Sequence, residues 1–103
     1  MLWHIVTFRF RGDVAAAERD ALAAEVRGLP GAIPELALLR VAPAIDDPDV
    51  LGVITGFADE AALAVYRDHP EHLPVVARAN ELCVSIQRLD MVSDDPHDAL
   101  PRT

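Results

Sequence analysis

The chain has 103 residues, of which 51% are hydrophobic, and this length and composition fit one folded domain rather than a disordered segment. Its formal net charge of −8 opposes contact with a phosphate backbone, so we expect no nucleic-acid partner. A single cysteine, Cys83, excludes an internal disulfide and a zinc site built from several cysteines.

The N-terminal part of the chain predicts a strand and then a helix. Residues 3–10, WHIVTFRF, are mostly β-branched and aromatic. The more apolar face of this strand carries His4, Val6, Phe8 and Phe10. Asp13 is expected to cap the following helix, and Gly28 with Pro30 is expected to end it.

The start of the chain also bears on location. It alternates like a strand and lacks the basic start of a signal peptide. No apolar run approaches the ~20 residues that span a bilayer. We therefore expect a cytoplasmic protein that has no membrane partner.

The remainder of the chain predicts three more strands, two more helical segments and a tail. The strands are expected at residues 36–42, 50–57 and 83–89, and the helical segments at about 60–68 and 70–81. Asp59 caps the first of these helices, and Pro70 disfavours helical geometry just before it. We expect a domain over residues 1–92 and a mobile acidic tail over residues 93–103.

The order strand–helix–strand–strand–helix–strand is typical of an α+β, ferredoxin-like fold with a four-stranded antiparallel sheet. Its helices cover one face of the sheet. The predicted strands at 3–10 and 50–57 are apolar on both faces, including Trp3 and Ile5 opposite the His4 face. Because an open apolar sheet face is too large for most monomers, we expect a homodimer formed through that face.

Three segments, HIVTFRF at the start, FADEAAL before a helix and YRDHPEH after it, resemble the stress-responsive dimeric α/β-barrel family over about residues 3–90. The resemblance implies a ferredoxin-like subunit that pairs into a dimeric barrel. Some members of that family are cofactor-free polyketide cyclases that close rings by aldol chemistry, and many others are stress-associated proteins without an assigned activity. In the cyclases the matching residues form the site, which implies His4, Tyr66 and His72 here.

The sequence also departs from the family pattern. Gly52 and Gly56 replace larger residues, Glu71 places a charge between the motif histidines, and Leu73 with Pro74 stiffens the segment that follows. These differences predict a reshaped pocket.

Enolate chemistry explains why such residues would be grouped. His72 would take a proton from the carbon next to a carbonyl, Tyr66 would hydrogen-bond the oxygen that gains charge, and His4 would orient the substrate. The expected ligand contacts are Val6, Phe8, Leu63 and His69. The alternatives are structural roles, in which His4 is a hydrogen-bonded core residue, Tyr66 and His72 tie down a corner, and His69 binds the last carbonyls of its helix.

We expect neither a metal nor a cofactor. Pro70 disturbs the register that His69 and His72 would need as paired ligands, and no phosphate-binding or dinucleotide-binding motif is present. His97 lies in the expected tail.

Three functions remain open: an enzyme acting on a hydrophobic or aromatic carbonyl compound, a barrel that binds such a ligand without turnover, and a purely structural protein. An enclosed cavity of ~300 Å³ or more, reached by both Tyr66 and His72, would favour the first two, and a filled interior would favour the third.

Overall fold

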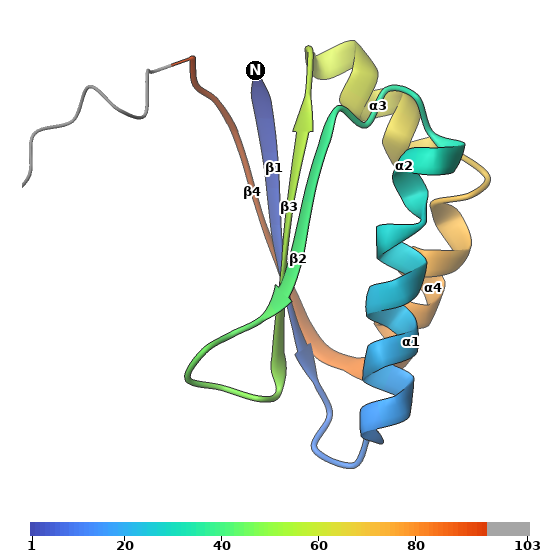
Figure 1. Ribbon diagram of the computed structural model, residues 1–103, viewed down its shortest axis with the longest axis vertical. Helices are drawn as coiled ribbons and strands as arrows, with labels where there is room; N and C mark the ends of the chain where they lie inside the picture. The colour runs from blue at the N-terminus through green and yellow to red at the C-terminus, as the bar shows by residue number, and fades with distance from the viewer. Residues whose placement is uncertain (95–103) are drawn as a thin grey trace, which may run out of the picture.

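The computed structural model describes residues 1–94 and contains four strands and four helical segments (Figure 1). In chain order they are β1 (Leu2–Phe10), α1 (Ala16–Arg27), α2 (Leu29–Ala32), β2 (Leu38–Pro43), β3 (Val50–Phe57), α3 (Glu60–Asp68), α4 (Leu73–Leu82) and β4 (Cys83–Val92). The predicted order is confirmed, with the short helix α2 added. Most of the predicted tail, including His97, lies outside the described residues.

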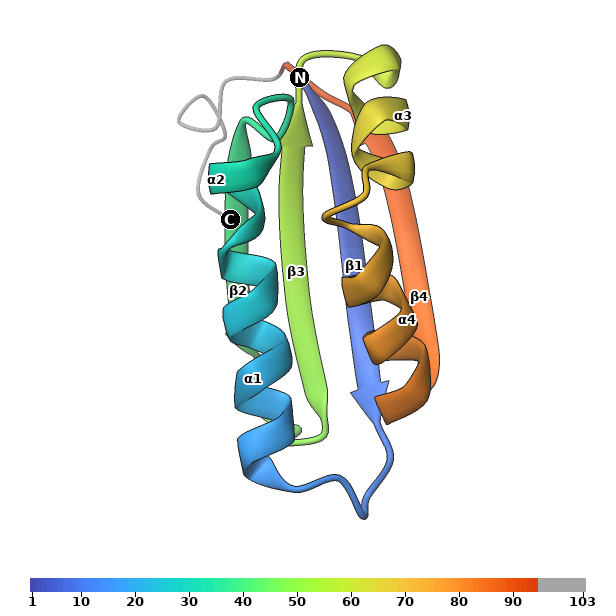
Figure 2. The ribbon, with the colours of Figure 1, turned by 90° about the vertical axis from the view of Figure 1, so that its right-hand side faces the viewer.

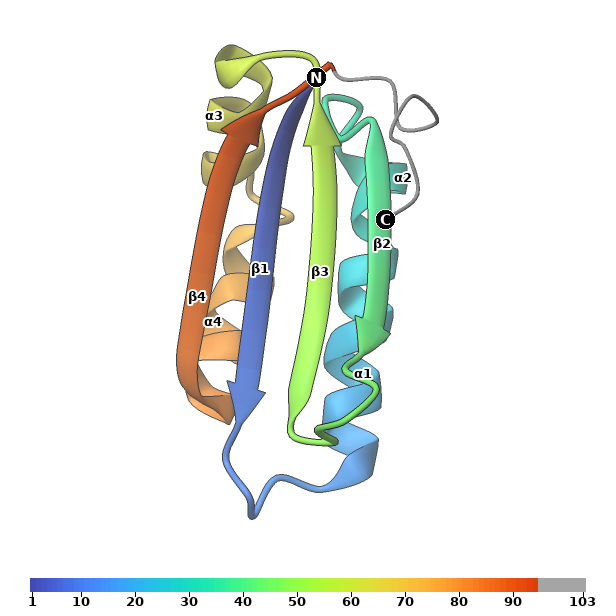
Figure 3. The same cartoon turned by 90° about the vertical axis from the view of Figure 1, so that its left-hand side faces the viewer.

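The strands form one antiparallel sheet in the order β2-β3-β1-β4, which is the ferredoxin-like arrangement. All helices lie on one face of this sheet. Figure 2 shows α1 and α2 over β2 and β3, with α3 and α4 over β1 and β4. The opposite face, turned to the viewer in Figure 3, carries no helix within the described part of the chain.

The N-terminal starts of α1 and α3 test the two helix caps that the sequence predicted. Asp59 caps α3 as predicted, because its carboxylate accepts a hydrogen bond from the Ala62 backbone N–H at 2.9 Å. The prediction for Asp13 is wrong. The helix begins three residues later with Ala15 as its N-cap and no side-chain cap, while Asp13 forms an ion pair with Arg11 in the preceding turn.

The core lies between the sheet and the helices. Its fully buried side chains are Leu22, Ile33, Thr55 and Phe57. On β1 the alternation matches the prediction, since His4, Val6 and Phe10 are buried on the helix side and Phe8 is half-buried. The core therefore positions His4 beneath the helices.

The open sheet face carries exposed apolar side chains. Ile54 is 39% exposed, Leu89 is 55% exposed and Met91 is 44% exposed. Gly56 belongs to this face, because it pairs with Trp3 and a Cβ there would lie 2.8 Å from the Met1 sulfur. Gly52, the partner of Thr7 and Ala42, lies on the same face. The two glycines therefore shape the open sheet face and not the predicted pocket.

None of the helices in the described part of the chain is both long and apolar enough to cross a membrane.

Candidate functional site

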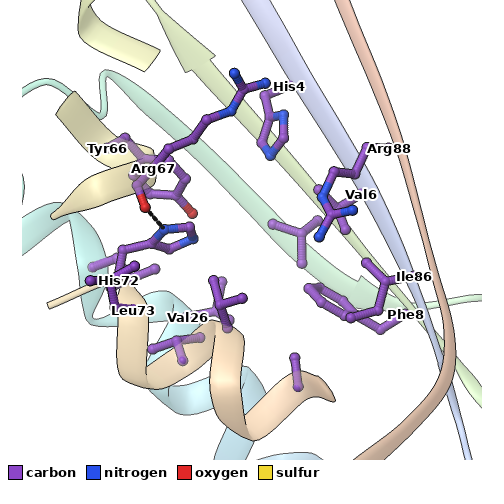
Figure 4. A pocket seen from close by; sticks show the side chains of 15 residues that line it. His4, Val6, Phe8, Val26, Tyr66, Arg67, His72, Leu73, Ile86 and Arg88 are labelled. Carbon is purple, nitrogen blue, oxygen red and sulfur yellow. Dashed lines mark hydrogen bonds between the residues drawn. The ribbon is translucent and has the colours of Figure 1, made fainter. Parts of the chain in front are cut away.

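A cavity of about 240 Å³ lies between the sheet and the helices (Figure 4). Its sheet side is lined by His4, Val6, Phe8, Val53, Ile86 and Arg88, and its helix side by Val26, Leu29, Tyr66, Arg67, His72, Leu73, Val75, Val76 and Ala79. The volume is slightly below the ~300 Å³ at which small-molecule pockets usually begin. The interior is therefore not filled, and a compact ligand would suit it.

Two other surface hollows have larger volumes, about 510 and 420 Å³, but neither is lined by a histidine or a tyrosine. We place the candidate site in the smaller cavity because its side chains can transfer protons.

Tyr66 reaches the cavity from the last turn of α3. Its side chain is buried, and its ring packs against Phe57 with 5.0 Å between the ring centroids. No hydrogen bond joins the hydroxyl to another residue of the described chain, and Figure 4 shows it directed toward the cavity. Burial raises the pKa of Tyr66 to about 12, so the phenol stays protonated at neutral pH and can donate a hydrogen bond.

His72 lies at the corner between α3 and α4, where it is the N-cap residue of α4. Its ring lies 4.0 Å from the Tyr66 ring, centroid to centroid. The Nδ1 atom is 3.3 Å from the Arg67 carbonyl oxygen, and because a carbonyl only accepts, Nδ1 carries the proton. The basic atom of the neutral ring is then Nε2. Burial lowers the pKa of His72 below its ordinary value, which keeps the ring neutral and able to accept a proton at pH 7.

His4 is held by a carboxylate that the sequence analysis did not identify. Its Nδ1 is hydrogen-bonded to an oxygen of Asp90, which follows from the pairing of His4 with Asp90 across β1 and β4. The second Asp90 oxygen accepts a hydrogen bond from Arg67 at 2.6 Å. Because a carboxylate oxygen accepts hydrogen bonds, the Nδ1–H of His4 donates to Asp90, and this contact fixes the orientation of the ring.

The structure brings His4, Tyr66 and His72 together, and it also places Val6 and Phe8 on the cavity wall. The rings of His4 and Tyr66 are 6.3 Å apart, centroid to centroid. Leu63 and His69 are not among the lining residues. Leu63 is buried in the core, and the Nδ1 of His69 accepts a hydrogen bond from the Glu71 backbone N–H at 3.1 Å. This contact stabilises the corner, whereas the sequence analysis expected His69 either to contact the ligand or to bind the last carbonyls of its helix.

Three charged residues around the cavity were missed: Arg67, Arg88 and Asp90. A signal for two of them was present, because Arg88 and Asp90 alternate with Leu89 and Met91 as strand residues do. The predicted strand ended at Leu89, while β4 continues to Val92.

The comparisons with known proteins agree with this fold. The model of the stress responsive A/B barrel domain matches residues 2–93, whereas no curated protein sequence matches the chain. A dimeric ferredoxin-like protein from Jannaschia sp. CCS1 is 26% identical, with a TM-score of 0.78 over 89% of this chain and 98% of that one.

Two more distant solved structures share the fold. One is a dimeric ferredoxin-like protein from Bacteroides fragilis, 22% identical, with a TM-score of 0.76 over 87% of this chain and 93% of that chain. The other is a hydroxynitrile lyase from Passiflora edulis, 17% identical, with a TM-score of 0.82 over 91% and 94% of the two chains. With nearly its whole described length matched, this chain belongs to the stress responsive A/B barrel domain family.

Proposed function

We propose that the chain forms a homodimer in which each subunit binds a compact hydrophobic or aromatic carbonyl compound and acts on it by cofactor-free acid–base catalysis. Aldol-type ring closure, as in polyketide cyclases, is the reaction that we favour. The observation that carries the proposal is the pairing of a protonated phenol and a neutral imidazole, Tyr66 and His72, on the wall of one apolar cavity.

Each residue has a role that follows from its protonation. The Nε2 atom of His72 takes a proton from the carbon next to the carbonyl, and the Tyr66 hydroxyl donates a hydrogen bond to the oxygen that becomes an enolate. His4, fixed by Asp90, orients the substrate from the opposite wall. A bound ligand would displace water from this mostly apolar cavity, which would strengthen both polar interactions.

The homodimer is supported by two observations. The open sheet face exposes Ile54, Leu89 and Met91, and ferredoxin-like proteins with the same fold are dimeric. A second copy placed on this face would bury these side chains and would leave the cavities on the outer, helix-covered sides. The hydroxynitrile lyase with this fold supports only the general point that the fold can carry a lyase.

The test of catalysis is product analysis with a panel of poly-β-keto thioesters. We expect His72→Ala to reduce ring-closed product by roughly 10²–10⁴-fold, the usual contribution of a positioned acid–base group. His69→Ala is the matched control, since it removes an imidazole three residues away that does not line the cavity. Equal product profiles for wild type and His72→Ala would exclude the cyclase function.

A barrel that binds its ligand without turnover is the second candidate, and the cavity size favours it. About 240 Å³ leaves little room for a long substrate to fold upon itself. In that case aromatic ligands would raise the melting temperature of the wild type, because they bind the folded state only, while no product would form.

A further inference from the structure

We propose that the ligand of this cavity carries a carboxylate, which binds to Arg88, while its apolar body occupies the space beneath the helices. This inference rests on the proposed function and specifies the class of ligand for the same site.

Arg88 belongs to the sheet wall of the cavity. It pairs with Val6 across β1 and β4, and its side chain is on the helix-covered side of the sheet. Figure 4 shows the guanidinium projecting across the cavity from the wall opposite Tyr66 and His72. The residue is also exposed, as expected at the opening beside an edge strand.

The guanidinium of Arg88 has no hydrogen bond or ion pair with any other residue between positions 1 and 94. The second arginine of the cavity, Arg67, differs because it donates to Asp90 at 2.6 Å. Both oxygens of Asp90 are already engaged, one by Arg67 and the other by His4. Asp90, the nearest carboxylate on the same strand, therefore does not pair with Arg88. The positive charge and the N–H donors of Arg88 remain available to a ligand.

Arg88 differs from the other arginines among residues 1–94 because its guanidinium has neither a carboxylate nor a carbonyl acceptor. With 17 acidic and 9 basic residues, carboxylates are in excess. Five other arginines of the described chain pair with carboxylates, as Arg9 does with Asp47 and Arg19 with Asp49. The remaining two, Arg27 and Arg40, donate to backbone carbonyl groups. An unpaired arginine at the mouth of an apolar cavity is suited to a ligand that is charged at one end and apolar elsewhere.

The charges around Arg88 favour a ligand that carries a single negative charge. One free guanidinium matches one carboxylate, which it can bind through two parallel hydrogen bonds. A phosphate monoester would carry more charge next to Asp90 and within a protein of net charge −8. We therefore infer an organic carboxylate and not a phosphorylated ligand.

The location of Arg88 also sets the position of the rest of the ligand. A carboxylate held there would place an apolar ring against Phe8 and Ile86. The atoms next to the carboxylate would then lie between the His4 wall and the wall formed by Tyr66 and His72. Carboxylate binding would thus present the reactive carbon to the histidine base.

The test compares two probes of the same shape, phenylacetate and its neutral amide, phenylacetamide. Dissociation constants are measured by calorimetry, and shifts in the NMR signals of Tyr66, the only tyrosine, verify that binding occurs in the cavity. We expect wild type to bind the acid about five- to tenfold more tightly than the amide, the range expected for a charge-assisted hydrogen bond that is partly exposed.

Variants assign the preference to one residue. Arg88→Gln should remove the preference by weakening only the acid, and Arg88→Lys should retain part of it. Arg78→Gln, which changes the net charge equally but lies outside the cavity, should retain it fully.

If Arg88→Gln keeps the preference, or if wild type binds both probes equally, the carboxylate inference is wrong while binding in the cavity stands. If neither probe shifts the Tyr66 signals, the proposed small-molecule function fails together with the inference.

Discussion

At the residue scale, the decisive group is a phenol without a hydrogen-bond partner in the described chain. A tyrosine hydroxyl that is removed from water usually has such a partner, because an unsatisfied polar group is costly. The Tyr66 side chain is only 4% exposed, yet its hydroxyl faces the cavity. The cavity must therefore supply water or a ligand to this oxygen, which is the arrangement expected of a binding site.

The burial of Tyr66 predicts how the protein responds to alkali. Because Tyr66 is the only tyrosine, the near-ultraviolet absorbance of phenolate reports this residue alone. We expect its midpoint at about pH 12 in the folded protein, compared with the ordinary value of 10.0 after unfolding in denaturant. Between these two values the unfolded state binds less proton than the folded state, so the free energy of unfolding should fall as the pH rises.

Circular dichroism over the same pH range separates ionisation in the folded chain from ionisation that follows unfolding. A folded-state midpoint near 10 would mean that the phenol is solvated, and it would contradict the burial of this side chain in the candidate site.

The site residues differ in how readily the sequence predicts them. Tyr66 and His72 are six residues apart and separated by a proline, so local rules bring them to one corner. The contact between His4 and Asp90 joins residues that are 86 positions apart. It depends on the register of β1 against β4, and alternation within one strand predicts which face a residue occupies but not which residue it meets.

At the element scale, the corner between α3 and α4 builds the helix side of the site. Pro70 ends α3, the residues that follow form a turn, and Pro74 fits the first turn of α4. The Tyr66 carbonyl accepts a hydrogen bond from the His69 N–H at 3.2 Å, and the His69 carbonyl accepts one from the His72 N–H at 2.9 Å. These contacts fix the spacing between the phenol and the second imidazole.

The caps of α1 and α3 give a matched pair of variants. Asp59→Ala removes the side-chain acceptor at the start of α3 and should lower the free energy of unfolding by about 1 kcal/mol, as measured by urea denaturation. Asp13→Ala should change it far less, because Asp13 only pairs with Arg11 at the surface. A larger loss for Asp13→Ala would show that α1 is capped after all by the residue that the sequence favoured.

Most elements follow from local patterns, and the exceptions have tertiary causes. The sequence predicted the four strands, and the break between α3 and α4, nearly where they occur. The start of α1 was misplaced because Val14, directly after Asp13, is buried at 7% exposure. The chain uses Asp13 in the turn that brings this valine into the core, and that requirement overrides the capping preference.

At the scale of the whole molecule, the one-sided sheet raises the question of what covers its other face. The apolar residues of this open face are neighbours across the strands, since Trp3 pairs with Met91 and Ile5 pairs with both Ile54 and Leu89. The polar residues Thr7 and Gln87 follow on the same face. The apolar part is therefore one continuous area around the start of β1, as a self-complementary contact between two copies requires.

A charge placed in that area should separate the subunits. We expect Leu89→Glu to convert the proposed homodimer into monomers, because a symmetric contact would bury both new carboxylates near each other. Val65→Glu is the control, since Val65 is also exposed, at 46%, but lies on α3 on the other side of the sheet. Analytical ultracentrifugation should show monomers for the first variant and dimers for the second.

Emission from Trp3, the only tryptophan, should also shift to longer wavelength in the monomer as the ring meets water. Wild type that sediments as a monomer at micromolar concentration would instead mean that this apolar sheet face stays open in solution.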